Sequence, residues 1–236
     1  MVTRPGRAGR APRRTDPLSR DVIVKAAADL LDAEGEDALT LRALTVRLAT
    51  GYGAIYHHVA DRNELLAAAT EHVITRAVPG PEPGAGPRQA LRAVALGLFD
   101  AIDAHPWVGA QLGREPWRPA LLDIYESVSG RLRELGVPER ALPDSAGVLV
   151  NYILGVAGQN AANARALAGS DTDRSAFLAD VAERWARLDP ARYPSMHRAG
   201  THLREHDDRE QFAAGVDLIL AGIETVHPAG SEGPDR

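Results

Sequence analysis

The stretch TLRALTVRLATGYGAIYHHVADRN, residues 40–63, contains the signals that decide the fold at this end of the chain. Thr40 can cap a short helix whose apolar side includes Leu44. After a turn that contains Gly51, a second short helical segment begins, with Ile55 on its apolar side. Two short helices separated by a tight turn are typical of a helix-turn-helix.

Helical patterns flank this motif on both sides. An apolar stripe at helical spacing predicts a helix over residues 20–34, capped by Ser19 and ended by Gly35. Residues 61–64 (DRNE) read as a capping box that opens a longer helix. Residues 19–78 are therefore expected to form a small helical DNA-binding domain.

A Pro/Gly-rich linker, PGPEPGAGP at residues 79–87, marks a boundary because proline and glycine interrupt helices. Only residues 145–160 offer a β-type alternative, and their length and alanine content favour a buried helix. The fold class is all-α, with a second helical domain over 88–226 and a flexible tail over 227–236. Within it, helices are expected at 88–104, 107–112, 117–135, 143–168, 173–188 and 209–226.

Charge is distributed unevenly along the chain. The formal net charge is −5, yet residues 1–20 contain six arginines and one aspartate. Residues 1–76 contain 11 basic and 10 acidic residues, against 16 and 22 in the remainder. A basic end on an acidic body fits a protein that contacts nucleic acid at that end. Residues 1–18 are expected to be a disordered basic arm that contacts the DNA minor groove, or a tail without a specific role.

The composition excludes several classes of function. The chain has no cysteine, which excludes disulfides and thiol nucleophiles. No apolar run approaches the ~20 residues that span a bilayer, so a cytoplasmic protein with no membrane contact is expected. One alternative remains, a zinc-dependent hydrolase using His202, Glu205 and His206, which match H-x-x-E-H. The pattern lacks an evident third ligand and runs into charged residues, so we expect no enzyme, no metal and no cofactor.

The N-terminal stretch resembles the DNA-binding domain of the tetracycline-repressor (TetR) family. The matching segments are LTLRAL (39–44), AIYHHV (54–59) and DRNELL (61–66). The resemblance implies that Thr40 and Arg42 contact phosphate or a base edge, and that Arg62 contacts phosphate. The residues implied to form the recognition helix and its contacts are Tyr52, Gly53, Ala54, Tyr56 and His57.

The sequence departs from the family pattern at two positions of the motif. Ala49 stands where a turn glycine is usual, and Gly51 where a Ser/Thr cap is common. Because Gly53 and Ala54 have no long side chains, base reading is expected to depend on Tyr52, His57 and DNA shape. Three non-DNA alternatives stay open, namely Tyr56 as a core aromatic, His58 as a packed histidine and Arg42 as surface charge.

The C-terminal half resembles the tetracycline-repressor ligand domain in HPWVGAQLGREP (105–116) and EQFAAGVDLILAGIE (210–224). This resemblance implies a homodimer through helices 143–168 and 209–226, with an effector cavity in each subunit. By the same resemblance, Gln111 and Gln159 stand where tetracycline repressors have residues of their magnesium site. Glutamine amides are poor magnesium ligands, so a magnesium–tetracycline chelate is not expected. A mostly apolar effector pocket is expected, with candidate residues His105, Trp107, Gln111, Trp117, Tyr125, Asn151, Tyr152, Gln159 and Asn160. A DNA-binding protein without any effector is the remaining alternative of this class.

Overall fold

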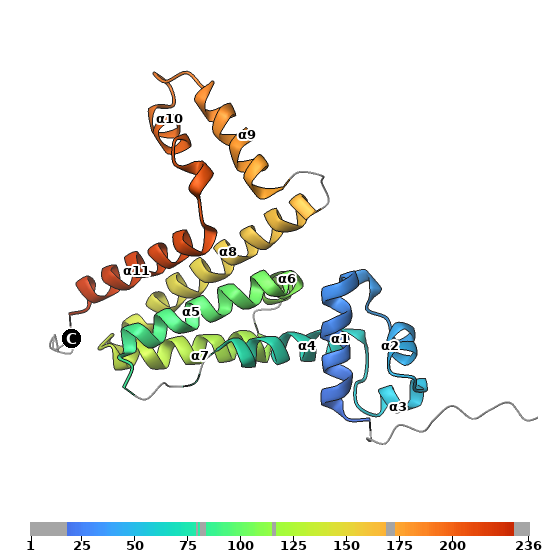
Figure 1. The fold of residues 1–236 in the computed structure, drawn as a ribbon. Helices are drawn as coiled ribbons and strands as arrows, with labels where there is room; N and C mark the ends of the chain where they lie inside the picture. Colours follow the sequence, from blue (N-terminus) through green and yellow to red (C-terminus); the bar gives the residue numbers. More distant parts are fainter. Residues whose placement is uncertain (1–17, 79, 81–83, 115–116, 169–172, 229–236) are drawn as a thin grey trace, which may run out of the picture.

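The computed structural model describes residues 18–78, 80, 84–114, 117–168 and 173–228. Within these ranges every regular element is a helix, which confirms the all-α expectation, residues 145–160 included (Figure 1). The N-terminal elements are α1 (Arg20–Glu34), η1 (Glu36–Ala38), α2 (Leu41–Arg47), α3 (Tyr52–Tyr56) and α4 (Arg62–Ala77).

Three of these helices begin at the capping residues that the sequence indicates. The side chains of Ser19 and Thr40 accept hydrogen bonds from the backbone N–H three residues later, at 3.3 and 3.1 Å. Asp61 accepts from the Glu64 N–H at 2.8 Å, and the Glu64 carboxylate accepts from the Ala60 N–H at 2.6 Å. These bonds satisfy N–H groups that the first helical turn leaves without intrahelical partners. The helix starts are therefore determined locally.

The turn between α2 and α3 contains Ala49 in a left-handed conformation, with φ of 49°. Among the described residues, it is the only one other than glycine with a positive φ. A Cβ in this region approaches the following carbonyl oxygen, which costs about 1–2 kcal/mol. The turn still forms because Leu44 and Leu48 before it and Ile55 after it are buried in the core.

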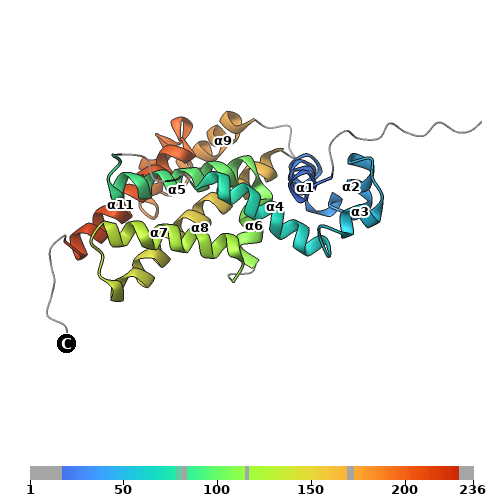
Figure 2. The same cartoon turned by 90° about the horizontal axis from the view of Figure 1, so that it is seen from below.

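The body of the protein consists of longer helices. They are α5 (Pro87–Ala104), α6 (Pro106–Arg114), α7 (Pro119–Glu134), η2 (Glu139–Ala141), α8 (Leu142–Ala168), α9 (Arg174–Ala186), α10 (Pro194–Gly200), η3 (Leu203–Glu205) and α11 (Asp208–Val226). Helix α8 packs against α5, α6, α7 and α11. The helix-turn-helix formed by α2 and α3 lies at one end of the molecule and α11 towards the other (Figure 2). Helices α9 and α10 pair with each other and project from the body (Figure 1).

A stack of three aromatic rings joins the helices of the body. Phe212 of α11 stacks on Phe99 of α5, with ring centroids 4.6 Å apart, and on Tyr152 of α8 at 5.5 Å. The Tyr152 hydroxyl donates to the Phe212 carbonyl at 3.2 Å, and burial raises the pKa of this tyrosine. Phe212 is fully buried, so this stack fixes α11 against α5 and α8.

The helix predictions agree with the structure to within about two residues at most ends, whereas α10 and η3 were not predicted. Helix α10 has no buried residue, so its sequence carries no apolar stripe. Residues 139–167 form the one described helical stretch long and apolar enough, by length and composition, to cross a membrane. In the fold this stretch is a body helix that buries Leu149, Val150 and Ile153.

Replacing Ala49 by glycine is expected to stabilise the protein. The substitution removes the left-handed penalty, and the greater freedom of glycine in the unfolded chain offsets part of the gain. We expect a net gain of about 0.5–1 kcal/mol, seen as a rise in Tm of roughly 1–4 °C by calorimetry. Ala60→Gly, at an exposed position with an ordinary φ, is the control and should not raise Tm. A lower Tm for Ala49→Gly would contradict the strain argument.

Candidate nucleic-acid interface and its link to the helical body

Helices α2 and α3 are held by their apolar sides, which leaves the opposite sides exposed. Leu44 of α2 and Ile55 of α3 are fully buried, and Val59 after α3 is 2% exposed. A helix of five residues has no stability of its own, so its position depends on these buried side chains and on its packing against α2. The free face of α3 is therefore presented as a rigid surface.

This free face carries the side chains that the sequence indicated. Tyr52 is 50% exposed, Tyr56 is 53% exposed, and His57 is also exposed. Exposure at Tyr56 excludes its role as a core aromatic. Nothing lies within 4 Å of the position a Cβ would take at Gly53, so the backbone there is open to close approach. His58 is half-buried, and its ring centroid lies 5.2 Å from that of His57.

The cationic side chains expected to contact phosphate differ in their surroundings. Arg42 is exposed on α2, beside Thr40 at the helix start. Arg62 instead donates from Nε to the Leu39 carbonyl at 2.9 Å and from Nη2 to the Glu36 carbonyl at 2.6 Å. Its guanidinium also lies 3.7 Å from the Glu36 carboxylate. Arg62 therefore ties the start of α4 to η1.

Two carboxylates next to the motif connect it to the body. Asp32 Oδ1 accepts from Trp107 Nε1 at 2.7 Å and lies 2.8 Å from His105 Nδ1. Glu36 accepts from Gln111 Nε2 and from Arg114 Nη1, both at 2.9 Å. All four partners lie on α6 or at the residue before it. We call these contacts of Asp32 and Glu36 with residues 105–114 the seam.

The sequence reasoning missed Asp32 and Glu36 as functional residues. Their partners lie 73–78 residues away along the chain, and no local pattern reports a contact at that separation. The four-residue spacing of the two acids was the only signal, and it is common on exposed helix faces. The seam is therefore a finding of the structure.

The residues expected to bind an effector lie in different places. His105, Trp107 and Gln111 contact the seam carboxylates, and Tyr125 is half-buried on α7. Trp117 is 70% exposed, and Asn151 is exposed on α8. Tyr152, Gln159 and Asn160 line a cavity of about 1040 Å³ between α8, α9, η3 and α11. We call this space the α8–α11 cavity.

The geometry of residues 202–206 does not form a zinc site. Leu203–Glu205 is a single 3₁₀ turn and His206 is extended, so His202 and His206 do not share an α-helical face. His206 Nε2 instead lies 3.1 Å from Asp208. No group of three metal-ligating side chains occurs among the described residues. The hydrolase alternative is not supported.

An exposed recognition helix on a helix-turn-helix, joined to a larger helical body, defines a DNA-binding regulator in two parts. The family model described as bacterial regulatory proteins, tetR family, matches residues 23–69. The model described as tetracyclin repressor-like, C-terminal domain, matches residues 80–227. The chain belongs to the TetR family of bacterial transcriptional regulators.

Similar proteins include named repressors and solved regulators. The transcriptional repressor DrrR1 of Streptomyces coeruleorubidus is 28% identical over 233 residues, which cover 93% of this chain and 82% of that protein. The TetR regulator SCO7222 of Streptomyces coelicolor has 48% identity and a TM-score of 0.82, over 89% of this chain and all of that one. ActR of the same organism, solved in complex with actinorhodin, has 26% identity and a TM-score of 0.71, over 90% and 100% of the two chains.

Removing the charge of Glu36 is expected to weaken the seam. Glu36→Gln keeps the shape of the side chain but removes its negative charge, so the ion pair with Arg62 is lost and the charge-assisted hydrogen bond from Arg114 is weakened. We expect the free energy of unfolding to fall by about 0.5–1.5 kcal/mol in urea denaturation at fixed protein concentration.

Glu139→Gln is the matched control for this substitution. Glu139 also pairs with an arginine, Arg133, but its side chain is 73% exposed, against 26% for Glu36. Ion pairs in such exposed positions contribute little because water screens them. An equal loss in the two variants would show that the seam adds nothing beyond an ordinary surface pair.

Proposed function

We propose that this protein is a repressor that binds a palindromic operator as a homodimer and is released by a small, mostly apolar effector. The observation that carries this proposal is the exposed face of α3, where two tyrosines and a histidine surround a glycine with open space above it. In a dimer, two such helices would enter successive major grooves about 34–36 Å apart. Since operators are intracellular, the protein acts in the cytoplasm.

Each side chain of the interface has a distinct role in this proposal. Tyr52 and His57 reach base edges, while Gly53 and Ala54 let the backbone approach the groove closely. Tyr56, Thr40 and Arg42 hold the backbone phosphates and so set the position of α3. Arg62 donates from Nε and Nη2 to the backbone carbonyls of Leu39 and Glu36, and its Nη1 would donate to a phosphate.

The basic arm falls mostly within residues 1–17, outside the described residues. As a proposal, its arginines add affinity that is independent of sequence and falls with rising salt, because bound cations displace condensed counterions. Minor-groove contact by the arm belongs to the same proposal.

The apolar surface left on α8 and α11 supports the homodimer. The most apolar 18-residue window of the stretch 139–167 has a mean hydropathy of 1.2, yet only 39% of that window is buried in the single chain. Val148 on α8 is 56% exposed, and Leu218 on α11 is 75% exposed. Long apolar helices exposed in this way mark protein interfaces. A second copy of the chain that packs α8 and α11 into a four-helix bundle would cover both.

The effector is proposed to enter the α8–α11 cavity. Val156, Phe177 and Leu178 give it apolar walls, and Gln159 and Asn160 offer hydrogen bonds. Gln111 does not line this cavity, since its amide faces Glu36 at the seam. A single magnesium chelate held by Gln111 and Gln159 is thus not part of the proposal.

Effector binding is proposed to release the operator through the seam and through α4, which connect the body to the DNA-binding end. Helix α6 packs on α8 and contacts Asp32 and Glu36, so a shift of α6 changes the position of α1 relative to the body. A coupling free energy of ~2–3 kcal/mol would weaken operator binding roughly 30- to 150-fold. An effector needs only to bind the shifted arrangement better than the DNA-bound one.

Shortening the exposed side chains of α3 is expected to reduce operator discrimination. The measurement is binding to DNA from upstream of the protein's own gene, titrated with salt and random competitor. Tyr52→Ala and His57→Ala should each reduce the ratio of specific to random binding by roughly 5- to 150-fold, which corresponds to 1–3 kcal/mol per lost base contact. Tyr193→Ala, an exposed tyrosine before α10, is the control and should leave the ratio unchanged. Full discrimination in both α3 variants would disprove the base-reading assignment.

A charge placed on α11 is expected to break the dimer. Leu218→Asp would bury an unpaired carboxylate in the proposed interface, which is strongly unfavourable. Sedimentation of the variant should show monomers at concentrations where the unmodified protein is dimeric. Leu122→Asp on α7, at a side chain that is also exposed, is the matched control and should stay dimeric. If Leu218→Asp sediments like the control, the interface lies elsewhere.

A further inference from the structure

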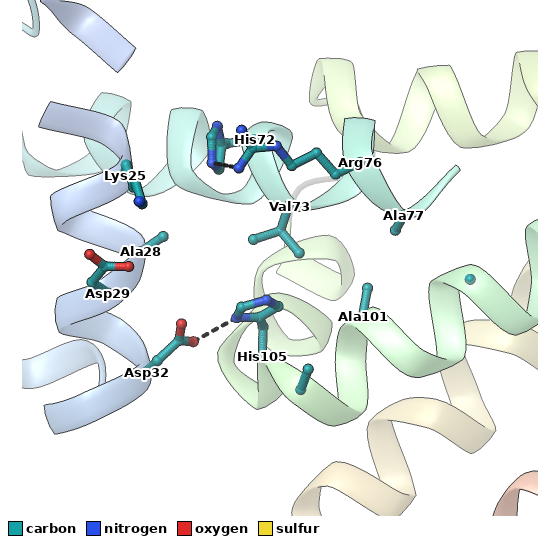
Figure 3. A pocket seen from close by; sticks show the side chains of 12 residues that line it. Lys25, Ala28, Asp29, Asp32, His72, Val73, Arg76, Ala77, Ala101 and His105 are labelled. Atoms are coloured by element: carbon teal, nitrogen blue, oxygen red, sulfur yellow. Dashed lines mark hydrogen bonds and ion pairs between the residues drawn. The ribbon is translucent and has the colours of Figure 1, made fainter. Parts of the chain in front are cut away.

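A second cavity lies between the DNA-binding end and the body. It has a volume of about 430 Å³ and is lined by α1, α4 and α5 together with His105 (Figure 3). None of its lining residues belongs to the α8–α11 cavity. Small side chains form part of its lining, namely Ala28 on α1, Ala77 on α4, and Ala101 and Ala104 on α5. A volume of this size suits a small organic molecule, and small side chains leave room for a flat one.

The carboxylates around this cavity already have partners. Asp32 is bound by His105 and by Trp107 at one oxygen, and the His105 contact forms part of the cavity wall (Figure 3). Asp29 lies 3.9 Å from Arg47 of α2. Both carboxylates are thus engaged by residues other than Lys25 and Arg76.

The two cations of the lining are Lys25, on α1 with both carboxylates, and Arg76 on α4. Arg76 of α4 donates to the imidazole of His72. Burial and, second, the charge of Arg76 lower the pKa of His72, so this imidazole is neutral at pH 7. Lys25 of α1 forms no ion pair or hydrogen bond within the described part of the chain, and neither cation there has a carboxylate partner. The formal charges of the lining balance, two cations against two carboxylates, but only the carboxylates are already engaged, so Lys25 and Arg76 keep donors for an anion.

We propose that this cavity is a binding site for an organic anion with a flat apolar body of one or two rings. The rings would lie against these alanines, and the anionic group would lie between Lys25 and Arg76. Lys25 is on the DNA-binding side and the lining residues Ala101 and Ala104 are on α5, so the ligand would contact both parts of the protein. It would bias their relative arrangement independently of a ligand in the α8–α11 cavity, and on the proposed function this changes operator affinity.

The test compares two probes that share one ring system, 2-naphthoate and the neutral 2-naphthamide. Both are titrated into the full-length protein by calorimetry in low salt and without DNA. We expect naphthoate to bind at least fivefold more tightly than naphthamide. Lys25→Gln and Arg76→Gln should each weaken naphthoate binding roughly two- to fivefold, as expected for partly exposed charges, and leave naphthamide unaffected. Ala104→Leu, at an exposed position on the cavity wall, should weaken both probes tenfold or more.

Two control variants locate the bound probe. Arg198→Gln removes an exposed cation on α10 and should not change naphthoate binding. Phe177→Ala alters the α8–α11 cavity and should also have no effect. The proposal is overturned if naphthoate does not bind, if naphthamide binds equally well, or if only Phe177→Ala weakens binding. Because no operator is present, these results are independent of whether the protein represses transcription.

Discussion

Helix α4 is shared by the two parts of the molecule, and the remaining structure depends on this. It packs against α1 on one side and against α5, α6 and α7 on the other. Five of its buried side chains belong to one continuous apolar cluster that extends from α1 to α11, namely Leu65, Leu66, Ala69, Val73 and Ile74. The burial of apolar surface is the dominant favourable contribution to folding. The DNA-binding end therefore cannot turn on the body without disturbing a core that both share.

The Pro/Gly-rich linker at residues 79–87 is a boundary in the sequence, but the packing of the helices shows no boundary at that place. It follows α4, so the helix that precedes the linker already belongs to both cores. Apolar packing alone does not set the exact orientation of the DNA-binding end relative to the body. Polar contacts set it, because hydrogen bonds are directional. Asp32 and Glu36 supply these contacts on α1 and η1, and both meet residues close to or within α6. The two halves are joined by one common helix and one polar seam.

Sequence reasoning was most successful where the determining interactions are local. Ser19, Thr40 and Asp61 act within three residues, so the starts of α1, α2 and α4 were predicted from the chain alone. Helix α10 was missed because it is short and has no buried side chain to produce an apolar pattern. Long-range contacts were missed for a different reason, namely that Asp32 and Glu36 look like ordinary surface acids until α6 is placed beside them.

The candidate site shows the same division. The buried side of α3 was predicted from the helical spacing of Ile55 and Val59, whereas Tyr52 and His57 came from the family resemblance; the structure leaves both of these side chains exposed. The effector residues were chosen by type, as aromatic and amide groups in one half of the chain. The type of a residue does not determine where its side chain points in the fold. Gln111 therefore contacts Glu36 at the seam, whereas Gln159 lines the α8–α11 cavity.

The indole of Trp107 is 4% exposed, and its N–H donates to Asp32 across the seam. An indole in contact with a carboxylate has an emission wavelength and intensity that depend on the position of that charge. The chain contains two other tryptophans, Trp117 and Trp185, and both can be replaced by phenylalanine. Trp107 would then act as an intrinsic optical probe, so that the relative motion of the two halves can be followed in real time without any added label.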